Sequence, residues 1–392
     1  MTTSRASRPI LRQISESAVI AVLRRDGARS RADLAKETGL SKQTMSEVIR
    51  ALEAAGWVRQ TGMTSGRVGR AAVLYEIDGR AGCLAGIDLG ATWLRLSLTD
   101  VLGAELASRE IRTEALGGDL PAGIAKALSQ LMPDSAGPLR HACLSVPGVI
   151  DPGTGRLTMA PQLPALMGVD LSATMQAALG CSVVVENDVN AAMLGEYWRG
   201  EAEATSAAYI SLGTGVGMGA IIGGQLLRGA SGAAGEVAYL PIGGDPQAGE
   251  SRKLGTLEAQ LGAAALLTRW HQAGGQGVGL DDLAQAARVG DAAATEVIAH
   301  AGKLGGALLV SVQAMLDPAL VVIGGKVGSL SQVFEAIRAE VATIAPRPMQ
   351  LIPGALGARA SVVGAAAQAR EAMFEVLFGA AVGVGNSISS PT

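Results

Sequence analysis

One carboxylate stands where a reaction or a binding site could use it, directly after an apolar segment. Asp188 follows the run Val183-Val184-Val185 and the polar pair Glu186-Asn187. A carboxylate at the end of a buried strand can act as a general base on a hydroxyl group, and the Asn187 amide can both donate to and accept from hydroxyls. Either side chain could instead cap the helix expected over 190–198, and the two roles are compatible.

Two glycine-rich turns, each between two apolar segments, could hold phosphate. The first contains Asp88, Gly90 and Thr92. Glycine lets the backbone approach a phosphate closely, the threonine supplies a hydroxyl, and the aspartate could hold a hydrated magnesium ion. The second contains Gly213-Thr214-Gly215, whose N–H groups could form a nest for a nucleotide phosphate. Each turn alone could be a plain hairpin, but the repeated design favours a phosphate site.

The segment before these turns has the spacing of a helix–turn–helix. We expect a first helix around Ser17–Leu23, a second over 31–38, a turn at Gly39-Leu40 and a third helix over 42–55. Ser41 is a good N-cap for the third helix. The apolar residues of that helix recur at i, i+3, i+4 and i+7, and they are Met45, Val48, Ile49 and Leu52.

The third helix and the segment after it offer candidate DNA contacts. Two extended runs joined by a Gly/Arg-rich tip predict a β-wing, and Arg67 and Arg70 at this tip could enter a minor groove or bind phosphate. Polar side chains at the start and on the outer face of the helix could reach base edges or phosphates. These candidates are Lys42, Gln43, Thr44 and Ser46. An ordinary helical hairpin with a solvated face remains the alternative.

Charge is divided unevenly along the chain and favours the DNA-binding interpretation. The residues through Tyr75 include 13 Arg or Lys and 6 Asp or Glu, which is a net charge of +7. The whole chain has a net charge of −3, so the remainder carries −10. A basic head on an acidic body is typical of a protein whose head alone binds a polyanion.

Length and composition set broader limits. A chain of 392 residues predicts two to three domains, and only 3% aromatic residues predict a core of Ala, Leu, Val and Ile. Cys83, Cys143 and Cys181 are far apart in apolar runs and are expected to be buried core residues. No apolar leader and no uninterrupted apolar run of about 18 residues is present. We therefore expect a cytoplasmic protein without a membrane partner.

Several motifs in a fixed order resemble the ROK family (repressor, open reading frame, kinase). The resemblance spans roughly residues 83–370 and implies a two-lobed α/β actin-like/hexokinase-type ATPase fold there, so the expected fold is the winged helix–turn–helix followed by this fold. With the basic module in front, the chain resembles ROK transcriptional repressors that respond to sugars such as xylose, glucose or N-acetylglucosamine derivatives. The motifs are Ile87–Thr92, Ser145–Asp151, Glu186–Ala192, Leu212–Gly217, Gly235–Val237, Leu316–Pro318 and Val322–Gly325.

The resemblance also assigns roles to individual residues. Asp188 falls on the catalytic-base position of the family's kinases. The second phosphate loop is Gly213-Thr214-Gly215, and the nucleotide-side turn is Gly324-Gly325. The positions that border or contact a sugar are Gly148, Asn187, Asp188, Glu236 and Glu258.

The chain departs from the family at a structural zinc site. Family members usually carry a histidine and three cysteines there, whereas this chain has Tyr239 for the histidine and no cysteine at the other positions. The residues that replace the cysteines are Gly249, Ser251 and Thr256. Tetrahedral zinc needs about four N or S ligands, so we predict no structural zinc. The loop should be looser unless packing around Tyr239 and Leu257 substitutes for the metal. Gln162 stands where asparagine is usual in the family, so the resemblance does not determine which sugar binds.

These observations predict a domain order and a function. We expect an arm over 1–14, a winged helix–turn–helix over 15–78, lobes over 81–195 and 196–378, and a disordered tail over 379–392. Most of 254–272 and 281–315 should be helical. The expected protein is a repressor of sugar-utilisation genes that binds operator DNA and a sugar effector, without a required cofactor. It should be a homodimer or a higher homo-oligomer. The alternative is a glucokinase or N-acetylhexosamine kinase, which would need ATP and magnesium. A regulator that binds a protein partner or no sugar is a third option.

Overall fold

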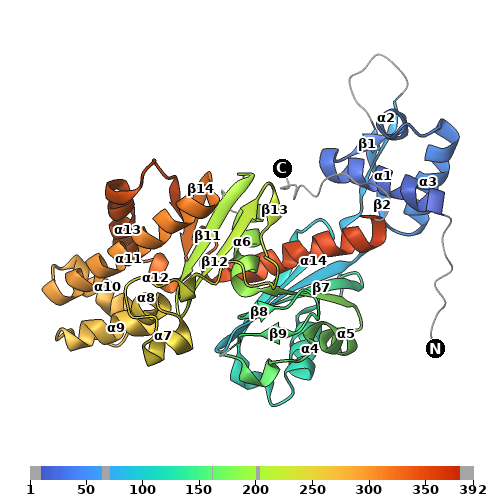
Figure 1. The fold of residues 1–392 in the computed structure, drawn as a ribbon. Helices are drawn as coiled ribbons and strands as arrows, with labels where there is room; N and C mark the ends of the chain where they lie inside the picture. Colours follow the sequence, from blue (N-terminus) through green and yellow to red (C-terminus); the bar gives the residue numbers. More distant parts are fainter. Residues whose placement is uncertain (1–9, 64–70, 161, 200–203, 380–392) are drawn as a thin grey trace.

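The computed structural model describes residues 10–63, 71–160, 162–199 and 204–379. In these ranges a small N-terminal module, a first lobe and a second lobe follow one another across the molecule (Figure 1). The predicted tip of the wing, with Arg67 and Arg70, and the predicted tail from 380 onward lie outside the described residues.

The N-terminal module is a winged helix–turn–helix, as predicted. Its three strands form a sheet in the order β1-β3-β2. Two serines determine where the second and third helices begin, because Ser30 Oγ accepts the Asp33 N–H at 3.2 Å and Ser41 Oγ accepts the Thr44 N–H at 3.1 Å. The elements are α1 Ile10–Asp26, β1 Arg29–Ser30, α2 Arg31–Thr38, α3 Lys42–Ala54, β2 Val58–Met63 and β3 Val73–Ile77.

The first helix is longer than the sequence pattern predicted. It begins at Ile10, so the arm expected over 1–14 extends too far. The helix was predicted from the apolar run around Val19, but Ile10 and Ile14 already lie at helical spacing before that run. Side chains four residues apart also interact on a helix, and Arg12 Nε donates to Glu16 Oε1 at 3.0 Å.

The first lobe is built on a five-stranded sheet in the order β10-β7-β4-β5-β6. Strands β4, β5 and β6 are antiparallel neighbours, whereas β7 and β10 run parallel to β4. The strands are β4 Cys83–Leu89, β5 Trp93–Asp100, β6 Glu105–Arg112, β7 Leu139–Val146 and β10 Ser182–Asn187, with the hairpin β8 Val149–Ile150 and β9 Leu157–Thr158. The helices are α4 Leu120–Leu131 and α5 Leu171–Leu179, with 3-10 turns at Gly79–Ala81, Thr113–Leu116 and Pro164–Leu166.

The second lobe repeats the same sheet topology in the order β13-β12-β11-β14-β15. In each lobe the first strand is central, a meander lies on one side and two parallel strands lie on the other, which explains why the strand–turn–strand motif occurs twice. The strands are β11 Ser206–Leu212, β12 Val216–Ile222, β13 Gln225–Leu226, β14 Leu320–Gly324 and β15 Leu351–Pro353. The helices are α7 Gly249–Leu254, α8 Glu258–Leu261, α9 Ala263–Gln272, α10 Leu280–Arg288, α11 Ala292–Leu316, α12 Gly325–Gly328 and α13 Ser331–Ile344, with 3-10 turns at Val237–Tyr239 and Gly357–Arg359.

Helix α11 is the one described helix that is long and apolar enough to cross a membrane. It belongs to the hydrophobic core of the second lobe, where Ala301, Leu308 and Val312 have no exposed surface. About 61% of its most apolar window is buried. Its apolar composition therefore reflects packing inside the lobe.

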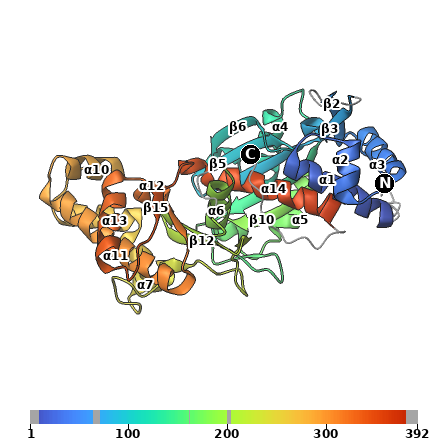
Figure 2. The ribbon, with the colours of Figure 1, turned by 90° about the horizontal axis from the view of Figure 1, so that it is seen from above.

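The last helix, α14 (Ala360–Phe378), does not pack where the domain prediction placed it. Residues 360–378 were expected in the second lobe, but α14 lies across the first-lobe sheet and extends to the winged module (Figures 1 and 2). A Cβ on Gly86 of β4 would overlap the Val362 carbonyl oxygen, so glycine permits this close approach. The hydrophobic cluster that holds Phe374 and Phe378 also contains Val19 and Ile20 of α1.

Candidate functional site

Helix α6 (Asp188–Arg199) begins where β10 ends, and Asn187 caps it. Asn187 Oδ1 accepts the N–H groups of Val189 and Asn190, both at 2.9 Å. Its Nδ2 donates to the Gly148 carbonyl at 3.0 Å and to Asp188 Oδ1 at 3.2 Å. The capping role of Asn187 thus also holds the Gly148 loop beside Asp188, and three of the predicted sugar-site residues come together.

Gly148 is required by its surroundings. Its φ of +120° is rarely adopted by residues with a side chain. A Cβ at this position would lie 2.8 Å from Ala160 Cβ and 3.1 Å from Leu157 Cδ1. A larger residue would push the hairpin of β8 and β9 away from Asp188.

Asp88 lies close enough to Asp188 for their charges to interact. Burial raises the pKa of Asp188 to about 6, and burial together with the Asp188 charge raises the pKa of Asp88 to about 7. Arg95 at 3.5 Å and the Ser145 hydroxyl at 3.3 Å oppose this rise in the pKa of Asp88. Arg95 and Ser145 already contact the Asp88 carboxylate. A role of Asp88 in holding hydrated magnesium stays a prediction.

Glu236 and Glu258 complete a group of carboxylates around Asp188. Burial raises the pKa of Glu236 first, and the charges of Asp188 and Glu258 raise it further. Burial also raises the pKa of Glu258, although the Val216 N–H donates to Glu258 Oε2 at 3.0 Å and lowers it. We call Asp188, Glu236 and Glu258 the carboxylate cluster. Such a cluster can accept hydrogen bonds from several hydroxyl groups of one ligand.

The second glycine-rich turn contacts this cluster. A Cβ on Gly215 would lie 2.9 Å from Glu258 Oε2 and 3.9 Å from Gln162 Nε2, so Gln162 also lies at this corner of the site. Thr214 is exposed at the tip. The Gly213 N–H already donates to the Gly215 carbonyl at 2.9 Å, so it is used inside the turn. The predicted nest must therefore rely on other N–H groups.

The turn at Gly324-Gly325 lies beside Gly213. A Cβ on Gly213 would be 3.6 Å from the Lys326 backbone nitrogen and 3.8 Å from Gly325 Cα. Sequence reasoning missed Lys326, an exposed cation next to both turns. Its position directly after Gly324-Gly325 was the available signal, because lysine commonly accompanies phosphate loops.

The first glycine-rich turn is a tight hairpin. The Gly90 N–H donates to the Trp93 carbonyl at 2.9 Å, and Thr113 Oγ1 donates to the Gly90 carbonyl at 2.8 Å. The Thr92 side chain is exposed. This geometry agrees with the plain-hairpin alternative and leaves phosphate binding at Gly90 and Thr92 a prediction.

The segment that departs from the family's zinc motif is held by other contacts. Leu257 has no exposed surface, and its N–H donates to the Ala238 carbonyl at 2.9 Å. Tyr239 is 44% exposed, so of the two residues whose packing could substitute for the metal only Leu257 is buried. Burial raises the pKa of the Tyr239 phenol, and the Glu236 and Glu258 charges add to it, so Tyr239 lies near the cluster. The side chains here do not fit tetrahedral zinc.

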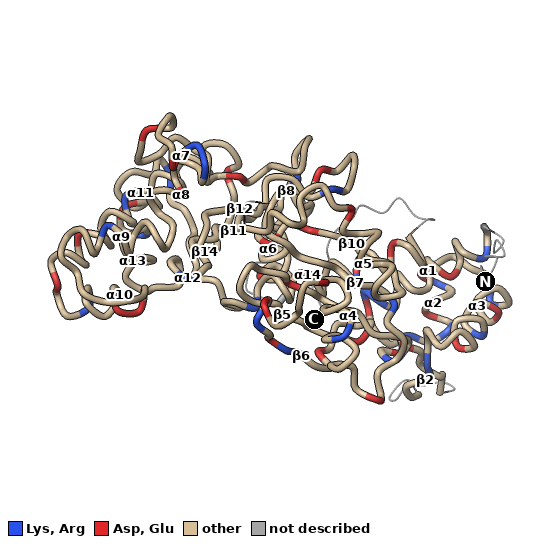
Figure 3. Tube along the Cα trace, turned by 90° about the horizontal axis from the view of Figure 1, so that it is seen from below, with Lys and Arg blue, Asp and Glu red and all other residues tan. Residues whose placement is uncertain are grey.

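The DNA-binding candidates on α3 differ in how available they are. Lys42 and Gln43 are exposed. Thr44 Oγ1 lies 2.8 Å from Ser41 Oγ, and Ser46 Oγ donates to the Lys42 carbonyl at 2.9 Å, so both hydroxyls already serve the helix. Figure 3 shows Lys and Arg positions around the winged module interspersed with Asp and Glu. Exposed Arg50 was not among the predicted contacts.

Ion pairs inside the module occupy some of its basic side chains. Arg25 pairs with Asp26 at 2.6 Å and with Glu37 at 2.7 Å, and Arg59 pairs with Glu76 at 2.7 Å. Asp26 and Glu37 are already subtracted in the net charge through Tyr75, so of these pairs only the one with Glu76 lowers it further.

Helix α14 contacts both sites. Near its start, Ser361 Oγ donates to the Asp188 carbonyl at 3.0 Å. Near its end, Glu371 accepts from Arg24 of α1 at 2.7 and 2.8 Å, and the Arg24 guanidinium lies 4.1 Å from the Phe374 ring centre. A single helix therefore joins the backbone of the carboxylate cluster to the winged module.

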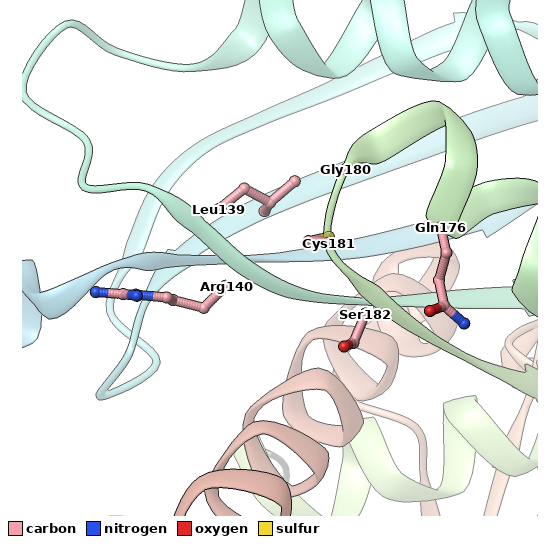
Figure 4. A pocket seen from close by; sticks show the side chains of 6 residues that line it. All are labelled: Leu139, Arg140, Gln176, Gly180, Cys181 and Ser182. Carbon is pink, nitrogen blue, oxygen red and sulfur yellow. The ribbon is translucent and has the colours of Figure 1, made fainter. Parts of the chain in front are cut away.

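A hollow of about 550 Å³ lies away from these residues, at the starts of β7 and β10 (Figure 4). Asn187 is at the opposite end of β10. Arg140, which lines the hollow, already donates to the Ala81 carbonyl at 2.9 and 2.8 Å. The hollow is lined by Leu139, Arg140, Gln176, Gly180, Cys181 and Ser182, and it contains none of the carboxylates described above.

Comparison with known proteins agrees with this geometry. A model of the ROK family matches residues 84–372, and a model of the MarR family matches residues 12–71. The chain is 27% identical to the xylose repressor of Caldicellulosiruptor bescii, over 83% of this chain and 86% of that protein. A ROK family transcriptional regulator, a homologue of the Escherichia coli MLC protein, superposes with a TM-score of 0.75 and 23% identity, covering 94% of this chain and 98% of that one. A ROK glucokinase from Streptomyces griseus with glucose and AMPPNP has a TM-score of 0.62 and 26% identity, covering 74% of this chain and all of the other.

Proposed function

We propose, from the premise that this chain belongs to the ROK family, that it is a sugar-responsive transcription regulator. It binds operator DNA through the winged module and represses genes of sugar utilisation. A sugar or sugar derivative between the lobes changes its affinity for DNA. The observation that carries the proposal is the combination, in one chain, of a winged helix–turn–helix with a half-buried carboxylate cluster. The named xylose repressor, similar along most of this chain, supports it.

The carboxylate cluster suits a polyhydroxylated ligand. Asp188, Glu236 and Glu258 come from three segments, and Glu236 lies within range of the charges of the other two. Carboxylates that are costly to ionise when buried gain most from hydroxyl donors, because each donor stabilises the charged form. The ligand changes DNA affinity only if it binds the two states of the protein differently.

A DNA-selection experiment followed by a sugar titration tests the proposal. Fragments selected from a random library should share a symmetric site, since we propose that the regulator is a homodimer that binds two half-sites. One of D-xylose, D-glucose or N-acetyl-D-glucosamine should shift the DNA titration by at least about tenfold. Absence of specific DNA binding at moderate salt contradicts the proposal. Light scattering on the purified protein checks the dimer.

Sugar phosphorylation is a second candidate function, favoured by one observation. Asp188 is half-buried, and its pKa is raised to about 6, which suits a general base near neutral pH. A kinase would need ATP and magnesium, whereas we propose that the regulator needs no cofactor. We propose that neither function needs zinc. Release of ADP with D-glucose or an N-acetylhexosamine, abolished in Asp188→Asn, would favour the kinase. Sugar binding without ADP release would favour the regulator.

A further inference from the structure

A buried carboxylate outside the carboxylate cluster lies two residues before Asp188. Glu186 on β10 is 4% exposed. Its Oε1 accepts from Asn190 Nδ2 and from the Asn187 N–H, both at 3.1 Å. Its Oε2 accepts from Arg228 Nε at 3.0 Å and from Arg228 Nη2 at 2.6 Å. A buried carboxylate is tolerated when its charge is paired and its oxygens are hydrogen-bonded, and Arg228 supplies the pairing charge.

This ion pair joins the two lobes. Glu186 is on β10, an edge strand of the first-lobe sheet, and Arg228 lies two residues after the end of β13, an edge strand of the second-lobe sheet. Two donors of the guanidinium reach one carboxylate oxygen. An ammonium group would provide one compact point charge in their place, so lysine could reproduce the charge but not the paired geometry.

Arg228 also begins the loop that ends at Glu236. The Ala234 N–H donates to the Arg228 carbonyl at 3.1 Å and closes this loop. The Gly235 carbonyl accepts the Met218 N–H at 3.0 Å and ties the end of the loop to β12.

The middle of the loop touches the first lobe. Gly232 has a φ of +79°, and a Cβ there would overlap the Ile150 carbonyl oxygen. The loop over 228–236 is therefore attached to its own lobe at its end and to the opposite lobe at Gly232 and at Arg228. The position of Glu236 depends on all of these attachments.

We propose that Arg228 is a positioning residue for the effector site, which is the proposed sugar site at the carboxylate cluster. By pairing with Glu186 across the lobes, it holds the loop over 228–236 and determines where the Glu236 carboxylate meets hydroxyl groups of a sugar. Arg228 acts through Glu236 and does not itself contact the ligand. This inference rests on the proposed function, because that function assigns Glu236 to the sugar.

Hydrogen exchange tests, without any ligand, whether the Arg228–Glu186 ion pair holds the loop over 228–236. Amides over 229–236 should exchange at least about tenfold faster in Arg228→Ala, with an intermediate effect in Arg228→Lys. The matched control is Arg269→Ala, since Arg269 is in the same lobe, its side chain is 43% exposed against 45% for Arg228, and its pair with Glu296 is loose at 4.0 Å. Unchanged exchange over 229–236 in Arg228→Ala overturns the proposal.

A double-mutant cycle tests whether Arg228 acts through Glu236. Calorimetric titration with D-xylose, D-glucose and N-acetyl-D-glucosamine should show binding at least about tenfold weaker in Arg228→Ala. The same substitution should change affinity by less than about twofold in a Glu236→Ala background. Additive effects of the two substitutions overturn the proposal. If the wild-type protein binds none of these sugars, the proposed function fails. Hydrogen exchange then still shows whether Arg228 holds the loop over 228–236.

A neutral pair covers the case in which Arg228→Ala does not fold. Removing both partners of a buried ion pair costs much less stability than removing one. The double variant Arg228→Met with Glu186→Gln should therefore fold and still show fast exchange over 229–236. Wild-type exchange in that variant contradicts the proposal.

Discussion

At the residue scale, the two aspartates with raised pKa values should make stability depend on pH. The pKa of Asp88 is raised to about 7 and that of Asp188 to about 6, above the unfolded value near 4. A carboxyl whose pKa is raised by folding contributes stability that is fully present below about pH 4 and is lost as pH rises through the folded pKa. The urea concentration at the midpoint of unfolding should therefore decrease as the pH is raised from about 4 to about 7.

The variant Asp88→Asn should flatten this dependence by on the order of 2 kcal/mol, measured by urea unfolding at about pH 5 and about pH 8. Exposed Asp134 provides the control, and Asp134→Asn should retain the wild-type slope. An unchanged slope in Asp88→Asn would show that Asp88 is ionised in the folded protein at little cost.

A single methyl group at Gly215 should disturb the effector site. The new Cβ would lie 2.9 Å from Glu258 Oε2 and would force this carboxylate to move. Gly215→Ala should weaken sugar binding about tenfold in calorimetry, a change of roughly 1.4 kcal/mol. Gly249→Ala is the matched control, because nothing lies within 4 Å of its Cβ position. Equal sugar affinities in Gly215→Ala and Gly249→Ala would show that Glu258 does not contact the sugar.

At the element scale, α3 should contribute charge to DNA binding independently of its stability. Lys42 is exposed at the start of the helix, so Lys42→Ala should weaken binding to all DNA sequences and lower the salt slope by about one. Lys303→Ala, an exposed position on α11, should leave the slope unchanged. Ser41→Ala should instead cost about 1 kcal/mol of stability, because it removes the N-cap. Fluorescence anisotropy at several salt concentrations separates these effects.

The segment around Leu257 should depend on apolar packing. We predict that a strong zinc chelator leaves the melting temperature unchanged and that elemental analysis finds no stoichiometric zinc. Leu257→Ala should destabilise the protein by about 2–4 kcal/mol, since the side chain is fully buried. Tyr239→Phe should have little effect on stability. A fall in melting temperature on chelation would contradict this prediction.

At the scale of the whole molecule, α14 should transmit the state of the effector site to the winged module. It contacts the Asp188 carbonyl at one end and Arg24 at the other. Arg24→Ala and Glu371→Gln should each reduce the effect of sugar on DNA binding, and the double variant should do no more than either one. Arg59→Ala, which breaks an ion pair inside the module, is the control. Additive losses, or a full sugar response in Arg24→Ala, would assign the coupling to other contacts.

What the sequence determined by itself is local, because its signals act within one turn or one strand. Ser41 caps α3 as predicted, α2 begins at the predicted residue Arg31, the buried face of α3 is the predicted one, and both glycine-rich turns lie between antiparallel strands. The ordered motifs also led to the family and its two-lobed fold. The start of α1 was wrong because Ile10 and Ile14, which lie at helical spacing, stand in a mostly polar segment that was taken for an arm.

Only the tertiary structure decided which distant residues meet, since such contacts leave no local pattern. Arg24 and Glu371 are 347 positions apart, and Arg228 and Glu186 are 42 apart. The packing of α14 on the first lobe, and not on the second, depends on a close helix–sheet approach that glycine permits at Gly86. The elevated pKa values likewise arise from burial and from charges brought together by folding. The sequence therefore specified the chemical groups, and the fold specified how they can act on one another.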